Sequence, residues 1–256
     1  MPPAARLSTQ TGLVIARGCG KIRGEGKEVV PILDKEDFQF LQEGLPFYTQ
    51  LEPAQQARLR QECARLSYRQ GDKLHRGSQD CAGLMLVRSG RLRVYILSQS
   101  GREITLYRLL EWDICLFSAA CIFRDINFEV WIEAERGSEV ILIPTALFGE
   151  LSQQNIAVAD TVNHLIASRF SDVMWVMEQV LFMSFDKRLA LFLLEQQAIE
   201  GSGRLELTHD MIANHLGTAR EVVTRMLKYF QGEGMVRLSR GMIEIVDEGR
   251  LRALAG

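Results

Sequence analysis

The sequence has few cysteines and prolines and no long hydrophobic run. Its five cysteines, an odd number among 256 residues, do not fit the disulfide framework of a secreted protein. No stretch approaches the roughly 18 consecutive apolar residues that a membrane span needs, and the first residues lack the apolar region of a secretory signal. Six prolines and 21 glycines are too few for a low-complexity chain. We therefore expect a globular protein of the reducing cytoplasm, with no membrane partner.

The chain also lacks an excess of positive charge. Its 30 Lys and Arg residues against 32 Asp and Glu residues give a formal net charge of −2. Residues 184–256 are neutral, because they hold ten residues of each sign. A basic balance is the usual electrostatic mark of a nucleic-acid-binding domain, so a polyanionic partner would have to be indicated by a local motif.

The first 154 residues divide into two stretches. Residues 1–34 are rich in glycine and show neither helical nor strand periodicity, which predicts a disordered extension. From residue 35 to 154 we expect short amphipathic helices over 34–51 and 53–66, and then strands separated by turn signals. The strand-like runs are 83–87, 91–97, 103–109, 128–134 and 140–143. Their spacing is typical of an all-β sandwich or barrel, so we predict a double-stranded, jelly-roll-like β-roll.

Residues 155–183 contain neither glycine nor proline and carry a regular apolar stripe. The stripe is Ala159, Val162, Ile166, Phe170, Val173, Met177 and Val180. Steps of three and four residues are close to the spacing of a coiled-coil seam. A helix of this length spans about 40 Å at 1.5 Å per residue, which is more than a small roll covers. We expect part of the stripe to pack on a second subunit, and the alternative is that all of it packs on its own roll.

Residues 207–230 have the pattern of a helix-turn-helix within a separate domain, 184–256, that ends in a hairpin over 236–245. Thr208 is well placed to cap a first helix, and Gly217 supplies the turn before a second helix that begins near Thr218 or Ala219. The expected inward face of the first helix is Met211, Ile212, Ala213 and Leu216. The chain is thus predicted to be an α+β protein with a β-roll, a long dimerisation helix and a winged helix-turn-helix.

The second helix is predicted to read DNA. Its expected buried side is Val222, Val223, Met226, Leu227 and Phe230. Three cations, Arg220, Arg225 and Lys228, outnumber Glu221, so the helix is locally positive inside a neutral domain. Arginine pairs with guanine and glutamate with cytosine N4, and the N-terminal part of a recognition helix reaches the base edges. The alternative is a charged face that is merely solvated. The candidate DNA-binding residues are Thr208, Thr218, Arg220, Glu221, Thr224, Arg225, Lys228 and Arg240.

These residues closely resemble the CRP/FNR superfamily of bacterial transcription regulators. The resemblance covers about 35–250 and rests on the segment Gly217–Arg225, on Arg-Gln-Gly-Asp at 69–72 and on Ser-Gly-Arg-Leu-Arg-Val-Tyr at 89–95. It implies a cyclic-nucleotide-binding-type roll, a homodimer on an inverted repeat of promoter DNA, RNA polymerase as a partner and an effector of unidentified chemistry. It also implies that Arg220, Glu221 and Arg225 read the half-site.

The resemblance does not imply that this chain binds cyclic AMP or an iron–sulfur cluster. Members that bind cyclic AMP have a Gly-Glu segment and an Arg-Ser pair, whereas here Arg124 is followed by Asp125. The long-helix positions that would bind adenine are Val173 and Met174, which have no hydroxyl group to donate. The cluster-binding members have closely spaced N-terminal cysteines, but only Cys19 lies near this N-terminus. Both cofactors are therefore disfavoured.

Other sensing chemistries remain open. Cys115 and Cys121 are either small buried side chains or a redox pair. His164 on the long helix is expected to be an exposed surface residue, and the alternative left open is a haem ligand, although the four histidines show no metal-binding spacing. The effector and redox candidates are Cys115, Cys121, Phe170, Val173 and Met174.

Two other functional classes compete with a DNA-binding regulator. A metal-dependent oxygenase built on the roll would need two histidines and a carboxylate, and the roll contains His75 alone. We therefore expect no enzymatic activity. The second class is a ligand- or redox-sensing module that acts through protein contacts, without DNA binding.

Overall fold

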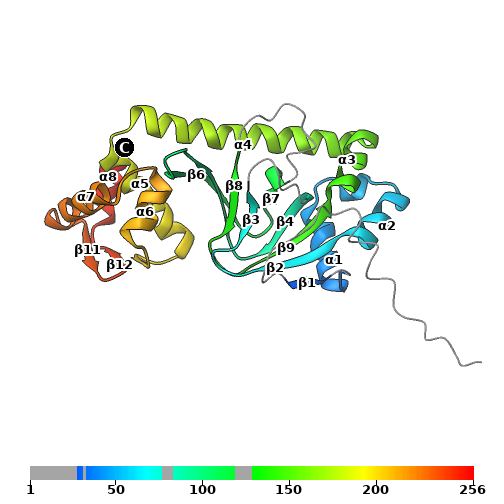
Figure 1. Cartoon of the computed structure of the whole chain (residues 1–256), viewed down its shortest axis with the longest axis horizontal. Helices are drawn as coiled ribbons and strands as arrows, with labels where there is room; N and C mark the ends of the chain where they lie inside the picture. The colour runs from blue at the N-terminus through cyan, green and yellow to red at the C-terminus, as the bar shows by residue number, and fades with distance from the viewer. Residues whose placement is uncertain (1–27, 31–32, 77–82, 119–128) are drawn as a thin grey trace, which may run out of the picture. The chain divides into compact units, whose positions relative to one another are not determined.

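The computed structural model describes residues 28–30, 33–76, 83–118 and 129–256 (Figure 1). The chain forms two compact units. One contains the described residues up to Val94 together with Tyr107–Arg169, and the other contains Tyr95–Leu106 together with Phe170–Gly256. None of the helices in the described part of the chain is long and apolar enough to cross a membrane.

The first unit contains most of the predicted β-roll, and the hairpin end Tyr95–Leu106 belongs to the second unit. A five-stranded sheet has the order β1 (Glu28–Val30), β2 (Ala64–Tyr68), β9 (Ser138–Pro144), β4 (Gly83–Ser89) and β7 (Ile114–Cys115). Its neighbouring strands pair antiparallel. A four-stranded sheet has the order β3 (Lys73–Arg76), β8 (Trp131–Ala134), β5 (Leu92–Leu97) and β6 (Glu103–Leu109). The predicted strands therefore exist, with their ends shifted by up to a few residues.

Helices cover the five-stranded sheet and supply much of the core of this unit (Figure 1). They are α1 (Lys35–Gly44), the 3-10 helix η2 (Tyr48–Gln50), α2 (Pro53–Glu62) and α3 (Thr145–Gln154). Asp34 caps α1 by accepting the Asp37 N–H at 2.8 Å. Leu41, Leu59 and Phe148 are almost completely buried against strand residues such as Leu86.

Two boundaries differ from the sequence prediction. The helix expected over 53–66 ends at Glu62, and Ala64–Tyr68 forms β2 instead. The alternating burial along β2 and its backbone pairing with β9 explain this strand. Within the extension expected to be disordered, Glu28–Val30 pairs with the edge of β2, because that edge offers unsatisfied backbone groups. Residues 1–27 lie outside the described residues.

The long helix predicted over 155–183 is observed as α4 (Ile156–Phe182). Its first turns bury Ala157, Val158 and Val162 in the core of the first unit. From Ile166 onward the apolar stripe is largely exposed in the single chain, with exposed fractions of 42% for Ile166 and 64% for Phe170. Only the beginning of the stripe is therefore covered by the chain's own roll.

The second unit contains the C-terminal domain. Its elements are α5 (Phe185–Glu200), β10 (Arg204–Leu205), α6 (His209–Leu216), α7 (Arg220–Gly232), β11 (Val236–Ser239), β12 (Met242–Ile245) and α8 (Glu248–Ala255). The strands form a small sheet in the order β10, β12, β11. Residues from α5, α6, α7 and α8 share one core with this sheet, including Leu193, Ile212, Leu227 and Leu251.

Gly217 makes the turn between α6 and α7, as predicted. Its φ of +66° lies in the left-handed region that favours glycine. The end of the β5–β6 hairpin, which belongs to the same unit, packs against this turn: Ile104 forms a bridge with Leu216. A Cβ atom on Gly217 would lie 2.3 Å from Cγ1 of Ile104, so both the backbone conformation and the packing require glycine here.

Candidate nucleic-acid interface

The first helix of the helix-turn-helix is capped as its sequence predicts. The Thr208 hydroxyl accepts the N–H of Met211 at 3.2 Å, and Ile212, Ala213 and Leu216 are buried. Met211, which was expected on the inward face, is instead 40% exposed. It lies in the first turn of α6, at the edge of the face formed by Ile212, Ala213 and Leu216, and its side chain stays partly outside the core. The inward face of α6 is narrower than the apolar pattern suggested.

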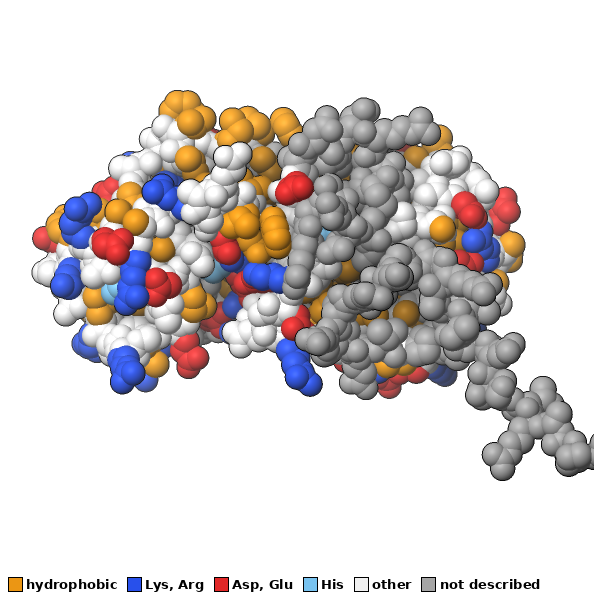
Figure 2. All heavy atoms as spheres, viewed as in Figure 1, with side chains coloured by type: hydrophobic (Ala, Val, Ile, Leu, Met, Phe, Trp, Pro, Cys, Tyr) orange, Lys and Arg blue, Asp and Glu red, His pale blue; other side chains and the backbone are white. Residues whose placement is uncertain are grey.

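The second helix, α7, separates an apolar side from a charged side. Val223, Leu227 and Phe230 are buried, while Val222 and Met226 are half-buried. The predicted DNA-contact residues Arg220, Glu221, Arg225 and Lys228 are all exposed. Figure 2 shows Lys and Arg side chains, interspersed with acidic ones, over the α7 and β11–β12 region. The helix thus buries one face in the domain core and presents cations on the other.

The first turn of α6 contacts two of the candidate DNA-binding residues on α7. Nη1 of Arg220 lies 3.0 Å from Oδ2 of Asp210, in an ion pair whose side chains are 62% and 60% exposed. The Thr224 hydroxyl lies 2.8 Å from Nδ1 of His209 and donates to the carbonyl oxygen of Arg220 at 2.9 Å. The contact of Asp210 with Arg220 was not predicted from the sequence. No spacing rule pairs residues across the turn, since that pairing depends on how the two helices cross.

The hairpin β11–β12 has the position of a wing after the helix-turn-helix. Arg204 and Arg237 both donate to Glu244, at 3.3 and 2.6 Å, and these hydrogen bonds hold the pKa of the Glu244 carboxyl below its ordinary value. Arg240 is exposed at the hairpin turn, beside Gly241 with a φ of +72°. The wing therefore presents Arg240 at its tip, while Glu244 engages the two other arginines. Thr218, also a predicted contact, is half-buried two residues before α7 begins at Arg220.

The sensing candidates are spread over both units. Cys115 is completely buried in β7, and burial raises the pKa of its thiol. Cys121, its predicted redox partner, lies outside the described residues. On α4, Phe170 and Met174 are 64% and 43% exposed, and Val173 is half-buried. The structure thus places Cys115 in the core and the two bulkiest α4 candidates on the surface of the single chain.

A further contact between α4 and the roll was not foreseen from the sequence. Within the first unit, the Arg169 guanidinium lies over the Tyr107 ring, 4.7 Å from its centroid. A second contact joins Nη2 of Arg169 to Oδ1 of Asp113 at 3.6 Å. His164 is exposed on the same helix, as we expected of it in preference to a role as a haem ligand. Among the described residues, no three His, Cys, Asp or Glu side chains cluster in a way that could hold a metal ion.

Comparison with known proteins identifies the relatives of this arrangement. Residues 187–254 match the Crp-like helix-turn-helix domain, and residues 65–155 match the cyclic nucleotide-binding domain. A crystal structure from Eubacterium rectale, described as a transcriptional regulator of the Crp/Fnr family, is 50% identical. It superposes with a TM-score of 0.82 and covers 83% of this chain and 99% of its own.

Two curated relatives come from Pseudomonas aeruginosa. The transcriptional activator protein Anr is 27% identical over 196 residues, which are 73% of this chain and 79% of the relative. The cAMP-activated global transcriptional regulator Vfr is 26% identical over 186 residues, which are 69% of this chain and 86% of the relative. With the roll, the long helix and the helix-turn-helix in place, these similarities show that the chain belongs to the CRP/FNR family of DNA-binding transcription regulators.

Proposed function

We propose that this regulator binds an inverted-repeat promoter site as a homodimer and reads each half-site with α7. The observation that carries the proposal is the division of α7 into a buried apolar side and an exposed side with Arg220, Glu221, Arg225 and Lys228. A recognition helix enters the major groove with its N-terminal residues against the base edges. Arg220, Glu221 and Arg225 lie in that part of α7.

Each side chain has a proposed role that follows from its chemistry. Arg225 donates to guanine O6 and N7, and Glu221 accepts from cytosine N4. Lys228 lies further along the helix and contacts phosphate, as do Thr208, Thr218 and the wing residue Arg240 near the edges of the interface. Thr224 faces the groove between Arg220 and Arg225. Such a mixture fits the general division of labour in which phosphate contacts position a protein and base contacts specify the sequence.

The homodimer is supported by the exposed part of the α4 stripe. Ile166, Phe170, Met177 and Val180 are between 42% and 64% exposed, and they recur at the spacing of a coiled-coil seam. Figure 2 shows hydrophobic side chains along the edge of the molecule formed by α4. An apolar row of this length is unfavourable in water and is the kind of surface that a second copy covers. Two copies related by a two-fold axis match an inverted repeat.

Control by a signal sensed in the roll completes the proposal. One relative is named as cAMP-activated, but the sequence here lacks the Arg-Ser pair expected for a cyclic phosphate, so we propose an effector other than cyclic AMP. We further propose RNA polymerase as the partner at the promoter. The competing function is a sensing module that acts only through protein contacts.

DNA binding distinguishes these functions directly. The experiment selects duplexes from a synthetic pool with a randomised centre, using the purified full chain, and then measures affinity by fluorescence anisotropy at several salt concentrations. We expect enrichment of an inverted repeat with half-sites about one helical turn apart. A pool that stays unenriched, with no measurable binding to any duplex, would favour the competing function.

A further inference from the structure

The contact between Asp210 and Arg220 bears on the role of Arg220 in DNA binding, which the sequence left open. Arg220 could read a guanine or contact a phosphate. In the structure its Nη1 atom lies 3.0 Å from the Asp210 carboxylate, and the two residues come from different helices of the helix-turn-helix. In the structure the carboxylate therefore lies beside the guanidinium on the exposed surface of the helix-turn-helix.

Charge favours the base edge for such a pair. An arginine paired with a carboxylate is neutral overall, so it gains little from a phosphate, and the carboxylate itself would be repelled by the phosphate charge. A guanine edge carries no net charge and offers two acceptors, O6 and N7. Arginine has five N–H groups, and an ion pair made through Nη1 leaves the Nε and Nη2 donors for those two acceptors.

The conformational entropy of the Arg220 side chain also favours a contact with the base edge. An exposed arginine populates many rotamers, and fixing one of them on binding costs conformational entropy. Asp210 restricts those rotamers before DNA arrives, although an exposed ion pair of this kind adds little to the stability of the fold. The neighbouring contact between His209 and Thr224, at 2.8 Å, gives a second link from the same turn of α6 to the exposed side of α7.

We propose that Asp210 is a positioning residue for base recognition, which holds the Arg220 guanidinium for a guanine and away from the phosphates. This inference rests on the proposed reading role of α7 and adds a residue to it. Asp210 acts through Arg220, so its effect must disappear when Arg220 is absent. That dependence separates positioning from the general effect of removing a negative charge near DNA.

The test is a double-mutant cycle on the intact protein. Duplexes selected from the randomised pool by the wild type serve as the probe, and Arg220→Ala identifies the base pair that Arg220 reads, because preference is lost there. Affinities for the selected duplex and for duplexes altered at that base pair are then measured for Asp210→Asn, for Asp210→Glu and for the double variant with Arg220→Ala. Glu206→Gln, which removes an equal charge from an exposed residue of the same domain, is the matched control.

We expect Asp210→Asn to reduce discrimination at that base pair by about three- to tenfold, a fraction of what a good bidentate arginine–guanine pair provides. Asp210→Glu keeps the carboxylate and should recover much of the loss, while Glu206→Gln should leave discrimination unchanged. In the Arg220→Ala background, Asp210→Asn should have no further effect on discrimination. The two aspartate variants change an exposed side chain, and their melting curves verify that the fold is intact.

Two results would overturn the inference while leaving the reading role of α7 in place. One is that Asp210→Asn discriminates at that base pair as well as the wild type does, although Arg220→Ala loses this discrimination. The other is an equal change in discrimination with and without Arg220, which would show that the charge of Asp210 acts on DNA by itself. If neither Arg220→Ala nor Arg225→Ala loses any base preference, the reading role of α7 is overturned, and the inference falls with it.

Discussion

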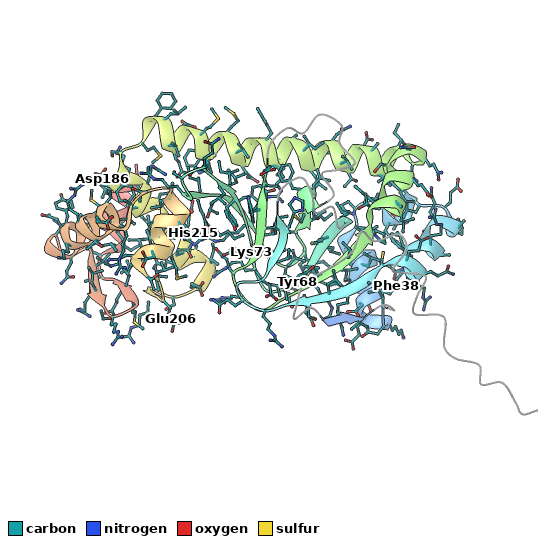
Figure 3. The ribbon with its side chains drawn as sticks, in the orientation of Figure 1. Phe38, Tyr68, Lys73, Asp186, Glu206 and His215 are labelled. Carbon is teal, nitrogen blue, oxygen red and sulfur yellow. The ribbon has the colours of Figure 1, made fainter. Side chains whose placement is uncertain are left out.

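The Thr105 hydroxyl lies 2.7 Å from Nδ1 of His215, so a hydrogen bond joins the end of the β5–β6 hairpin to the last turn of α6. Figure 3 labels His215. His215 is 8% exposed, and its ring lies 5.2 Å from that of Phe192. Next to it, Nη2 of Arg188 donates to the carbonyl oxygen of Leu216 at 2.6 Å. These contacts surround the turn of the helix-turn-helix and fix the backbone from which α7 starts.

The first prediction concerns Gly217 in that turn. Gly217→Ala should lower the free energy of unfolding by about 1–3 kcal/mol, because alanine is strained at positive φ and its Cβ would overlap Ile104. Chemical denaturation of the purified chain measures the change. Gly232→Ala is the control, since a Cβ there meets no atom within 4 Å and alanine is the better helix former. Equal stability of the two variants would contradict the requirement for glycine at 217.

The second prediction concerns assembly. Ile166→Asp or Val173→Asp should give monomers that no longer bind the selected DNA, because a charge in an apolar seam is left unpaired at a cost of several kcal/mol. Analytical ultracentrifugation gives the mass. Ser168→Asp introduces the same charge at an exposed position about 200° around the helix from Ile166 and should stay dimeric. If Ile166→Asp sediments as a dimer, the stripe is not the interface.

The third prediction separates a base-reading residue from a phosphate-contacting one. Arg225→Ala should lose about 1–3 kcal/mol of binding free energy on the selected duplex and discriminate poorly among sequences. By contrast, Lys228→Ala should weaken binding to all sequences alike. It should also reduce the slope of the logarithm of the binding constant against the logarithm of salt concentration by about one. Anisotropy titrations on selected and scrambled duplexes measure both. Equal losses on the two duplexes for Arg225→Ala would show that α7 is not the reader.

The fourth prediction concerns Cys115. Burial raises the pKa of its thiol, so little thiolate forms near neutral pH, and thiolate is the reactive species. We expect Cys115 to resist alkylation in the folded protein and to react after denaturation, as measured by mass spectrometry of the labelled peptide. The affinity for selected DNA should also be the same under oxidising and reducing conditions. A redox response that Cys115→Ser abolishes would instead identify Cys115 as part of a sensor.

Local pattern determined much of this protein from the sequence alone. Alternation predicted strands such as Glu103–Leu109, and the apolar steps of three and four predicted the long helix α4. The Thr208 cap predicted the start of α6, and the Gly217 turn predicted the break between α6 and α7. Both predictions were possible because caps and left-handed turns depend on the residue at that position. The charged side of α7 followed from the same periodicity, since the buried Val223, Leu227 and Phe230 recur at helical spacing.

The tertiary structure alone decided which side chains meet. Ala64–Leu66 continued an amphipathic helical pattern in the sequence, but these residues form a strand because their backbone pairs with β9. Met211 fitted the apolar face of α6, yet it is exposed because the domain core contacts a narrower face. The pairing of Asp210 with Arg220 has no local signature, because it is set by the angle at which α6 and α7 cross. Long-range packing therefore decided the detail of the reading surface, while local periodicity decided that such a surface exists.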